Sequence, residues 1–99
     1  MHGSLGSMTP SQRAALGDVL RIAHAGQAMV SVSCKDKLNV TIVKTVRRLD
    51  DPDVNSLLSG IADATRGSVD HGEESADSDE WIVRSRDMDV TLRSTRTLG

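Results

Sequence analysis

In the first patterned segment of the chain, apolar residues recur at helical spacing, which indicates a helix from Thr9 to Gly26. Thr9 is an N-cap candidate, Pro10 suits the first helical position, and Gln12 would complete a capping box. Gly26 predicts the end of the helix. The apolar positions that would form its buried stripe are Leu16, Val19, Leu20 and Ala23.

Strict alternation of apolar and polar residues follows this helix. The stretch Val30–Cys34 alternates with serines, which predicts a half-buried strand. Lys35–Lys37 would form a turn, and the alternation resumes over Leu38–Val43 with β-branched residues that favour a strand. Together these segments predict a β-hairpin.

The second half of the chain repeats this order. Asp51 and Pro52 predict the start of a second helix, which Gly67 would end. The stretch 68–80 is polar and acidic, and we expect a flexible loop there. A second hairpin is predicted over residues 81–93, and the tail from Ser94 is expected to fray.

These elements predict an α+β domain over residues 8–99 with the order αββαββ. We expect a four-stranded antiparallel sheet with two helices on one face. The segment 34–42 resembles 85–92, which is consistent with an internal duplication, although generic capping and alternation rules would also produce two similar halves. Residues 1–7 resemble a cloning remnant, and we expect them to be disordered.

The composition limits the class of protein. The chain has 99 residues, with neither Phe nor Tyr, so Trp81 is its one aromatic residue apart from histidines. A core of small aliphatic side chains is marginal in a monomer of this size, which favours a homodimer. One cysteine, Cys34, excludes a disulfide scaffold and a cysteine-type zinc finger. No stretch reaches the roughly 18 apolar residues of a membrane helix, and we expect a cytoplasmic protein.

The formal charge of −2 hides a strong segregation of charge along the chain. Residues 1–48 hold seven Lys and Arg against two Asp and Glu, whereas residues 49–80 hold one against ten. Residues 81–99 hold four against two. Either the acidic segment binds a basic partner, or it folds over the basic strands and neutralises them within the domain.

The pattern yields two sets of candidate binding residues. Protein-partner binding is predicted at the aromatic and acidic residues around the end of the loop, namely Trp81, Asp77, Asp79 and Glu80. The alternative is nucleic-acid binding through the basic hairpins, with phosphate contacts from Lys35, Lys37, Lys44, Arg47, Arg48, Arg84, Arg86 and Arg93.

No catalytic, cofactor or metal residues are assigned. The acidic loop lacks the ligand spacing of an EF-hand, and the chain has no glycine-rich phosphate loop. We interpret the chain as a non-catalytic regulator or adaptor that binds another protein and acts as a homodimer. Its small size suggests a phage, plasmid or bacterial accessory protein.

Overall fold

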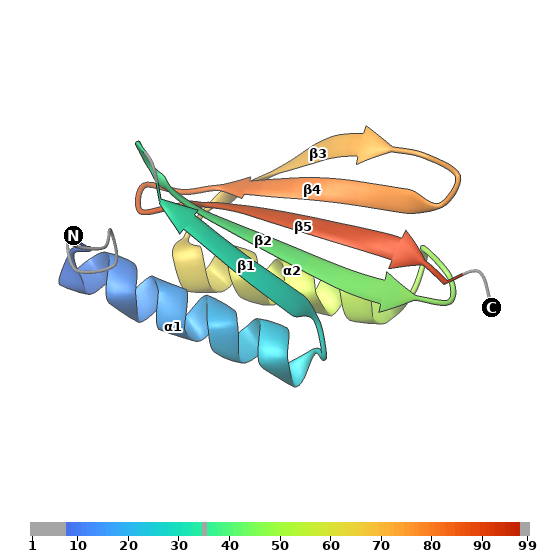
Figure 1. The fold of residues 1–99 in the computed structure, drawn as a ribbon, viewed down its shortest axis with the longest axis horizontal. Coiled ribbons are helices and arrows are strands. Elements are labelled where there is room, and N and C mark those ends of the chain that lie inside the picture. Colours follow the sequence, from blue (N-terminus) through green and yellow to red (C-terminus); the bar gives the residue numbers. More distant parts are fainter. Residues whose placement is uncertain (1–7, 35, 98–99) are drawn as a thin grey trace.

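The computed structural model describes residues 8–34 and 36–97 of the chain. The predicted cloning remnant, residues 1–7, lies outside this described part. Two helices and five strands follow one another in the order αββαβββ, as Figure 1 shows. Their bounds are α1 Pro10–Ala25, β1 Met29–Cys34, β2 Leu38–Val46, α2 Pro52–Thr65, β3 Ser68–Glu74, β4 Ser78–Arg84 and β5 Asp89–Arg96.

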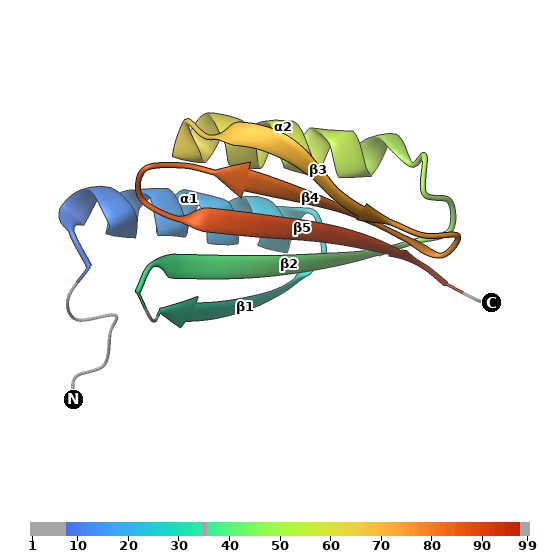
Figure 2. The same cartoon turned by 90° about the horizontal axis from the view of Figure 1, so that it is seen from above.

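The five strands form one mixed sheet with the order β1-β2-β5-β4-β3. The central pair, β2 and β5, is parallel, and the other three pairs are antiparallel. The helices run antiparallel to each other and cover the same face of the sheet (Figures 1 and 2). The predicted α+β class and the two helices on one face are therefore confirmed, whereas a four-stranded, purely antiparallel sheet is wrong.

The difference arises in the acidic segment, which is a strand and a tight hairpin where we expected a flexible loop. β3 pairs with β4 on both sides of a register shift between His71 and Glu74, and Val69 lies beside Val83 on the helix-covered face. On the other face Asp70 forms an ion pair with Arg84 at 3.2 Å. Opposite charges on neighbouring strands favour this pairing, and they compensate for the weak intrinsic strand preference of acidic residues.

The predicted duplication does not match the topology. The similar segments lie side by side in the parallel pair, with Val40 beside Val90 and Ile42 beside Leu92. Both strands are central and covered by helices, and this shared environment favours the same alternation of residues in each. By strand direction and position in the sheet, the counterpart of α1–β1–β2 is α2–β3–β4, and β5 lies between the two units.

The core is aliphatic, as the composition predicts. Alternating residues of the central strands, such as Val40, Ile42, Val90 and Leu92, are completely buried under the helices. The alternation continues to Ser94, which is also fully buried, so the predicted fraying from this residue is wrong. β5 extends to Arg96 because it pairs with β2 on one side and β4 on the other.

The start of each helix agrees with its sequence signals. Thr9 and Gln12 form the predicted capping box, with hydrogen bonds of 3.1 and 2.9 Å. The Asp51 side chain accepts a hydrogen bond from the backbone N–H of Asp53 at 2.9 Å. Each interaction satisfies donors that a helix leaves unpaired at its N-terminus.

The helices end at the predicted glycines: Gly26 is the C-cap of α1, and Gly67 directly follows Arg66, the C-cap of α2. The left-handed residues are Gln27 and Arg66, with φ values of 56° and 55°, and neither is glycine. The neighbouring glycines are required for close packing. A Cβ on Gly26 would lie 2.6 Å from the Leu57 side chain, and a Cβ on Gly67 would lie 2.6 Å from Cγ1 of Val83.

Candidate functional site

A cluster of three ionisable side chains lies on the hairpin formed by β3 and β4. Nε2 of His71 lies 2.6 Å from Oδ1 of Asp79 and 3.6 Å from Oε2 of Glu74. One ligating atom from each of the three residues falls within 4.8 Å of the other two. The cluster thus brings one imidazole nitrogen and two carboxylates to a single point.

An irregularity in β3 makes this convergence possible. In a regular strand His71 and Glu74 would point to opposite faces, because side chains alternate with a period of two. The pairing of β3 with β4 shifts register between these two residues, which is typical of a β-bulge. Gly72 lies within the irregularity, where a Cβ would come 2.7 Å from Oε1 of Glu80. The bulge therefore turns Glu74 toward His71.

Trp81 lies against the same cluster. Its ring stacks on the imidazole of His71, with centroids 5.6 Å apart and an interplanar angle of 24°. The indole is half-buried and packs on the edge of the aliphatic core. Trp81 is thus both a packing residue and one side of the candidate site.

The hydrogen bond to Asp79 raises the pKa of the His71 imidazole above its ordinary value, and the charges of Asp79 and Glu74 act in the same direction. Partial burial opposes this shift but does not reverse it. The free cluster therefore favours a protonated imidazole, with two carboxylates that accept its charge.

A pocket of about 380 Å³ opens beside the cluster, between the hairpin and the N-terminal end of α2. Four carboxylates and one indole line it, so the pocket is suited to a cation. Its lining residues are Leu49, Asp50, Asp51, Val54, Asn55, Glu74, Ser75, Asp79 and Trp81.

The structure brings together two of the four predicted partner-binding residues. Trp81 and Asp79 both line the pocket. Glu80 instead forms an ion pair with Arg93 at 3.4 Å, and Asp77 forms one with Arg96 at 3.3 Å. Part of the acidic segment thus pairs with basic residues within the domain, as the second of the two explanations predicts, while Glu74 and Asp79 line the pocket.

The predicted phosphate-binding residues are not free to act together. Lys35 lies outside the described residues. Lys37, Arg84, Arg93 and Arg48 form ion pairs with Asp89, Asp70, Glu80 and Asp50, respectively. Lys44 donates a hydrogen bond to the carbonyl oxygen of Gly26 at 2.7 Å. Arg47 and Arg86 are exposed but lie at opposite ends of the sheet, on the β2–α2 connection and the β4–β5 turn.

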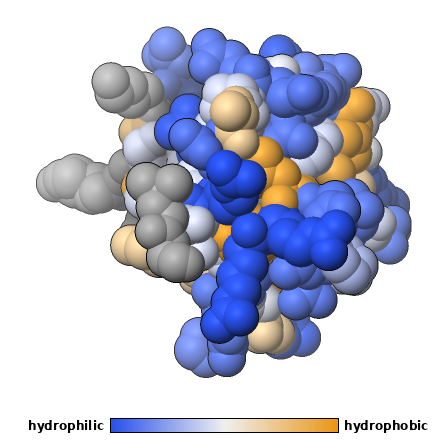
Figure 3. All heavy atoms as spheres, turned by 90° about the vertical axis from the view of Figure 1, so that its right-hand side faces the viewer, coloured by the Kyte–Doolittle hydropathy of each residue, from blue (hydrophilic) through white to orange (hydrophobic). Residues whose placement is uncertain are grey.

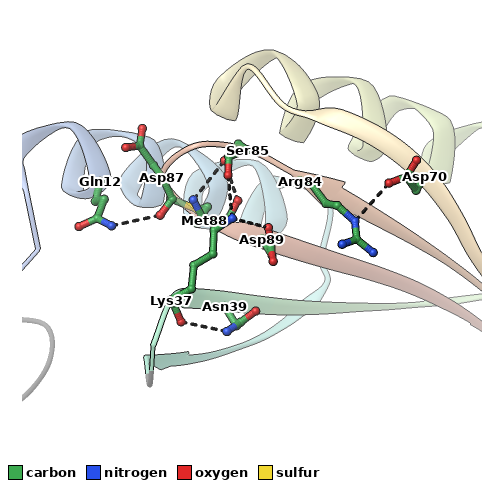
Figure 4. A network of polar contacts seen from close by, with 9 residues as sticks. All are labelled: Gln12, Lys37, Asn39, Asp70, Arg84, Ser85, Asp87, Met88 and Asp89. Carbon is green, nitrogen blue, oxygen red and sulfur yellow. Dashed lines mark hydrogen bonds and ion pairs between the residues drawn. The ribbon is translucent and has the colours of Figure 1, made fainter.

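Lys37 has a structural role that Figure 4 shows. Its ammonium group donates to the carbonyl oxygen of Ser85 and to Oδ1 of Asp89, each at 3.0 Å. From the other side, Gln12 of α1 donates to the carbonyl oxygen of Asp87 at 3.1 Å. The β4–β5 turn is therefore held by two other elements, and Lys37 is committed to this contact.

The end of the molecule opposite to the β4–β5 turn carries exposed apolar surface between strongly hydrophilic side chains (Figure 3). A groove of about 440 Å³ lies there between the last turn of α1 and the first half of α2. Ile22 and Leu57 contribute apolar walls, and Gly26 and Gly60 keep the helices close.

The two edges of the sheet differ in character. β1 has no charged residue, and its apolar side chains Met29 and Val32 are 74% and 38% exposed. β3 carries three carboxylates and a histidine, and its regular pairing is interrupted before Glu74. Charges and bulges are means by which proteins prevent an edge strand from pairing with another chain, and within the described residues β3 carries both whereas β1 carries neither.

Sequence reasoning missed His71 and Glu74 as members of the site. Residues three positions apart lie on opposite faces of a regular strand, so this spacing does not predict that the two side chains meet. The acidic surroundings are typical of solvated surface. Gly72 between them is the one local signal that indicates a bulge.

Models of known protein families, curated protein sequences and solved structures contain no match to this chain. Neither helix in the described part of the chain has the length and hydrophobicity needed to cross a membrane.

Proposed function

We propose that this chain is a non-catalytic, protein-binding adaptor of the cytoplasm that acts as a homodimer. The dimer forms when β1 of one copy pairs antiparallel with β1 of a second copy, so that one sheet continues through both. The observation that carries this proposal is the uncharged, exposed edge of β1, from Met29 to Cys34.

The edge of β1 offers what strand addition requires. Only one side of the strand pairs with β2, so the backbone N–H and C=O groups on its other side are available for another strand. The side chains of residues 29–34 point alternately to the two faces of the sheet. When β1 of two copies pairs antiparallel, side chains of one face lie opposite side chains of the same face in the second copy. Burial of Met29 and Val32, the two exposed apolar side chains, would add a hydrophobic contribution of about 25 cal/mol per Å² of apolar surface.

The arrangement of the dimer also suits an adaptor. β1 and β3 are the two edges of the sheet, and pairing through β1 leaves β3 of each copy at the far ends of the joined sheet. The dimer would therefore present two identical β3–β4 hairpins, each with its acidic pocket, to other proteins. Origin from a bacterial or phage accessory gene is compatible with this small architecture.

Size-exclusion chromatography with multi-angle light scattering tests the dimer. We expect the full chain at micromolar concentration to elute with twice the mass of one chain. Val32→Lys should shift the protein to the monomer mass, because each copy would then place a charged side chain at the edge where the two strands meet. A monomeric wild-type protein across the accessible concentration range contradicts the proposal.

The other edge provides a matched control. Val69 on β3 is 43% exposed, close to the 38% of Val32, and Val69→Lys places the same charge on the opposite edge. This variant should remain dimeric. If Val32→Lys and Val69→Lys weaken the dimer equally, pairing does not occur through β1.

A further inference from the structure

We propose that His71, Glu74 and Asp79 bind a divalent transition-metal ion such as Zn²⁺. This site is independent of the proposed dimer, because it lies on the hairpin at the other edge of the sheet. The β3–β4 hairpin would then bind a specific ion. Neither the acidic residues of the hairpin nor Trp81 predicts this ion from the sequence alone.

The three ligating atoms lie within 4.8 Å of one another, and His71 Nε2 is close to both carboxylates. Two ligands bound at about 2.1 Å from Zn²⁺ lie about 3.0 to 3.4 Å apart at octahedral and tetrahedral angles, respectively. The pair His71 Nε2 and Glu74 Oε2, at 3.6 Å, is close to this range. His71 Nε2 and Asp79 Oδ1, now hydrogen-bonded at 2.6 Å, would separate by about 0.4 to 0.8 Å to admit the ion.

The donor types select the class of ion. Ca²⁺ and Mg²⁺ prefer oxygen ligands, whereas an imidazole nitrogen combined with carboxylates suits Zn²⁺ and its neighbours in the first transition row. A neutral imidazole and two carboxylates would balance the double charge of the ion. Three protein ligands leave at least one coordination position for water or for a group of a partner protein.

The surroundings support the ligands. Oδ1 of Asp79 also accepts a hydrogen bond from the backbone N–H of Glu80 at 3.2 Å, and its side chain is only 17% exposed. The Trp81 ring limits the movement of the His71 imidazole. Asp51 lines the adjoining pocket and makes the potential at the site more negative, whereas Asp50 in the same lining is paired with Arg48 at 2.9 Å.

One further polar group near the cluster lacks a partner. Ser94 is the cross-strand neighbour of Asp79, on the same face of the sheet. Its hydroxyl is fully buried and has no hydrogen-bond partner among the described residues. A ligand of the proposed site therefore lies next to a buried hydroxyl for which the described residues supply no partner.

Titration of the full chain with Zn²⁺ tests the proposal, because Trp81 stacks on one of the ligands and its fluorescence reports binding directly. We expect a saturable fluorescence change and a calorimetric stoichiometry of one ion per chain. His71→Ala should weaken Zn²⁺ binding at least tenfold, and Glu74→Gln and Asp79→Asn should each weaken it measurably. Mg²⁺ at the same concentration should leave the fluorescence unchanged.

The other two histidines of the sequence are the matched controls. His2→Ala and His24→Ala should bind Zn²⁺ with the wild-type affinity. Circular dichroism identifies any variant that fails to fold. If His71→Ala does not fold, the Zn²⁺ affinity of Glu74→Gln, a change at an exposed side chain, tests the site instead. The proposal is overturned if Zn²⁺ produces no saturable response, if His71→Ala and Glu74→Gln bind as tightly as wild type, or if Mg²⁺ binds equally well.

Discussion

The imidazole of His71 stacks on the indole of Trp81 at a centroid distance of 5.6 Å, and its Nε2 atom reaches Asp79 on the neighbouring strand. The same ring is therefore fixed by an aromatic face and by a carboxylate. This arrangement links the packing of the β3–β4 hairpin to an imidazole whose pKa is raised above its ordinary value by the hydrogen bond to Asp79.

The first prediction concerns the pKa of His71 in metal-free protein. Asp79→Asn should lower this pKa markedly, because the hydrogen bond to Asp79 is the main cause of its elevation. Glu74→Gln should lower it less, since Glu74 acts only through its charge at 3.6 Å. NMR titration of the imidazole proton signals in the presence of a chelator measures both. An equal or larger effect of Glu74→Gln would contradict the geometry.

The direction of the pKa shift also fixes how stability depends on pH. The folded-state pKa of His71 lies above the unfolded value of about 6.5, so its protonation stabilises the folded state fully at lower pH. This contribution is lost as the pH rises through the folded-state pKa. Urea denaturation should show that the stability difference between wild type and His71→Ala shrinks from pH 5.5 to pH 8.5. A difference that grows with pH would reverse the predicted sign.

A second prediction uses the buried hydroxyl of Ser94. Because this group has no hydrogen-bond partner among the described residues, Ser94→Ala should raise the free energy of unfolding by about 1 kcal/mol in metal-free protein. Ser68→Ala, at an exposed position of β3, should change it little. A lower free energy of unfolding in Ser94→Ala would contradict this prediction and show that the hydroxyl makes a hydrogen bond.

The end of α2 yields a third prediction. Arg66 occupies the left-handed region, so Arg66→Gly should stabilise the protein by about 1 kcal/mol. Gly67→Ala should destabilise it by about 1 to 3 kcal/mol, because the added Cβ would press on Val83 and on the carbonyl oxygen of Arg84. Chemical denaturation of the two variants measures both effects. Destabilisation by Arg66→Gly would show that the Arg66 side chain makes a larger contribution than its backbone strain.

A fourth prediction concerns nucleic acid. Phosphate affinity requires several unpaired cations on one surface, whereas Lys37, Arg84 and Arg93 are paired with carboxylates. A labelled DNA duplex should therefore show no shift with this protein, even at low salt. A salt-dependent shift that is abolished by Arg47→Ala combined with Arg48→Ala would contradict this expectation.

Local sequence signals were sufficient for much of the fold. The capping box at Thr9 and the cap at Asp51 depend on residues within three positions of each other, and alternation over residues 38–42 and 88–92 reports burial directly. β3 was missed because Asp70 is stabilised in a strand by Arg84, which lies 14 positions further along the chain. No local rule contains that pairing.

The candidate site shows the same limit. Asp79 and Trp81 stood out by residue type, but His71 and Glu74 join them only through the shifted register of β3. The glycines present a related case. Gly26 and Gly67 mark the helix ends as predicted, but only the structure shows that their small size is also required against Leu57 and Val83.

The central claim is that β1 pairs with β1 of a second copy, and isotope-filtered NMR on dimers mixed from labelled and unlabelled chains tests it most directly. We predict intermolecular nuclear Overhauser effects among the backbone protons of residues 29–34, in an antiparallel pattern. Intermolecular effects confined to other residues, or none at millimolar concentration, would contradict the claim.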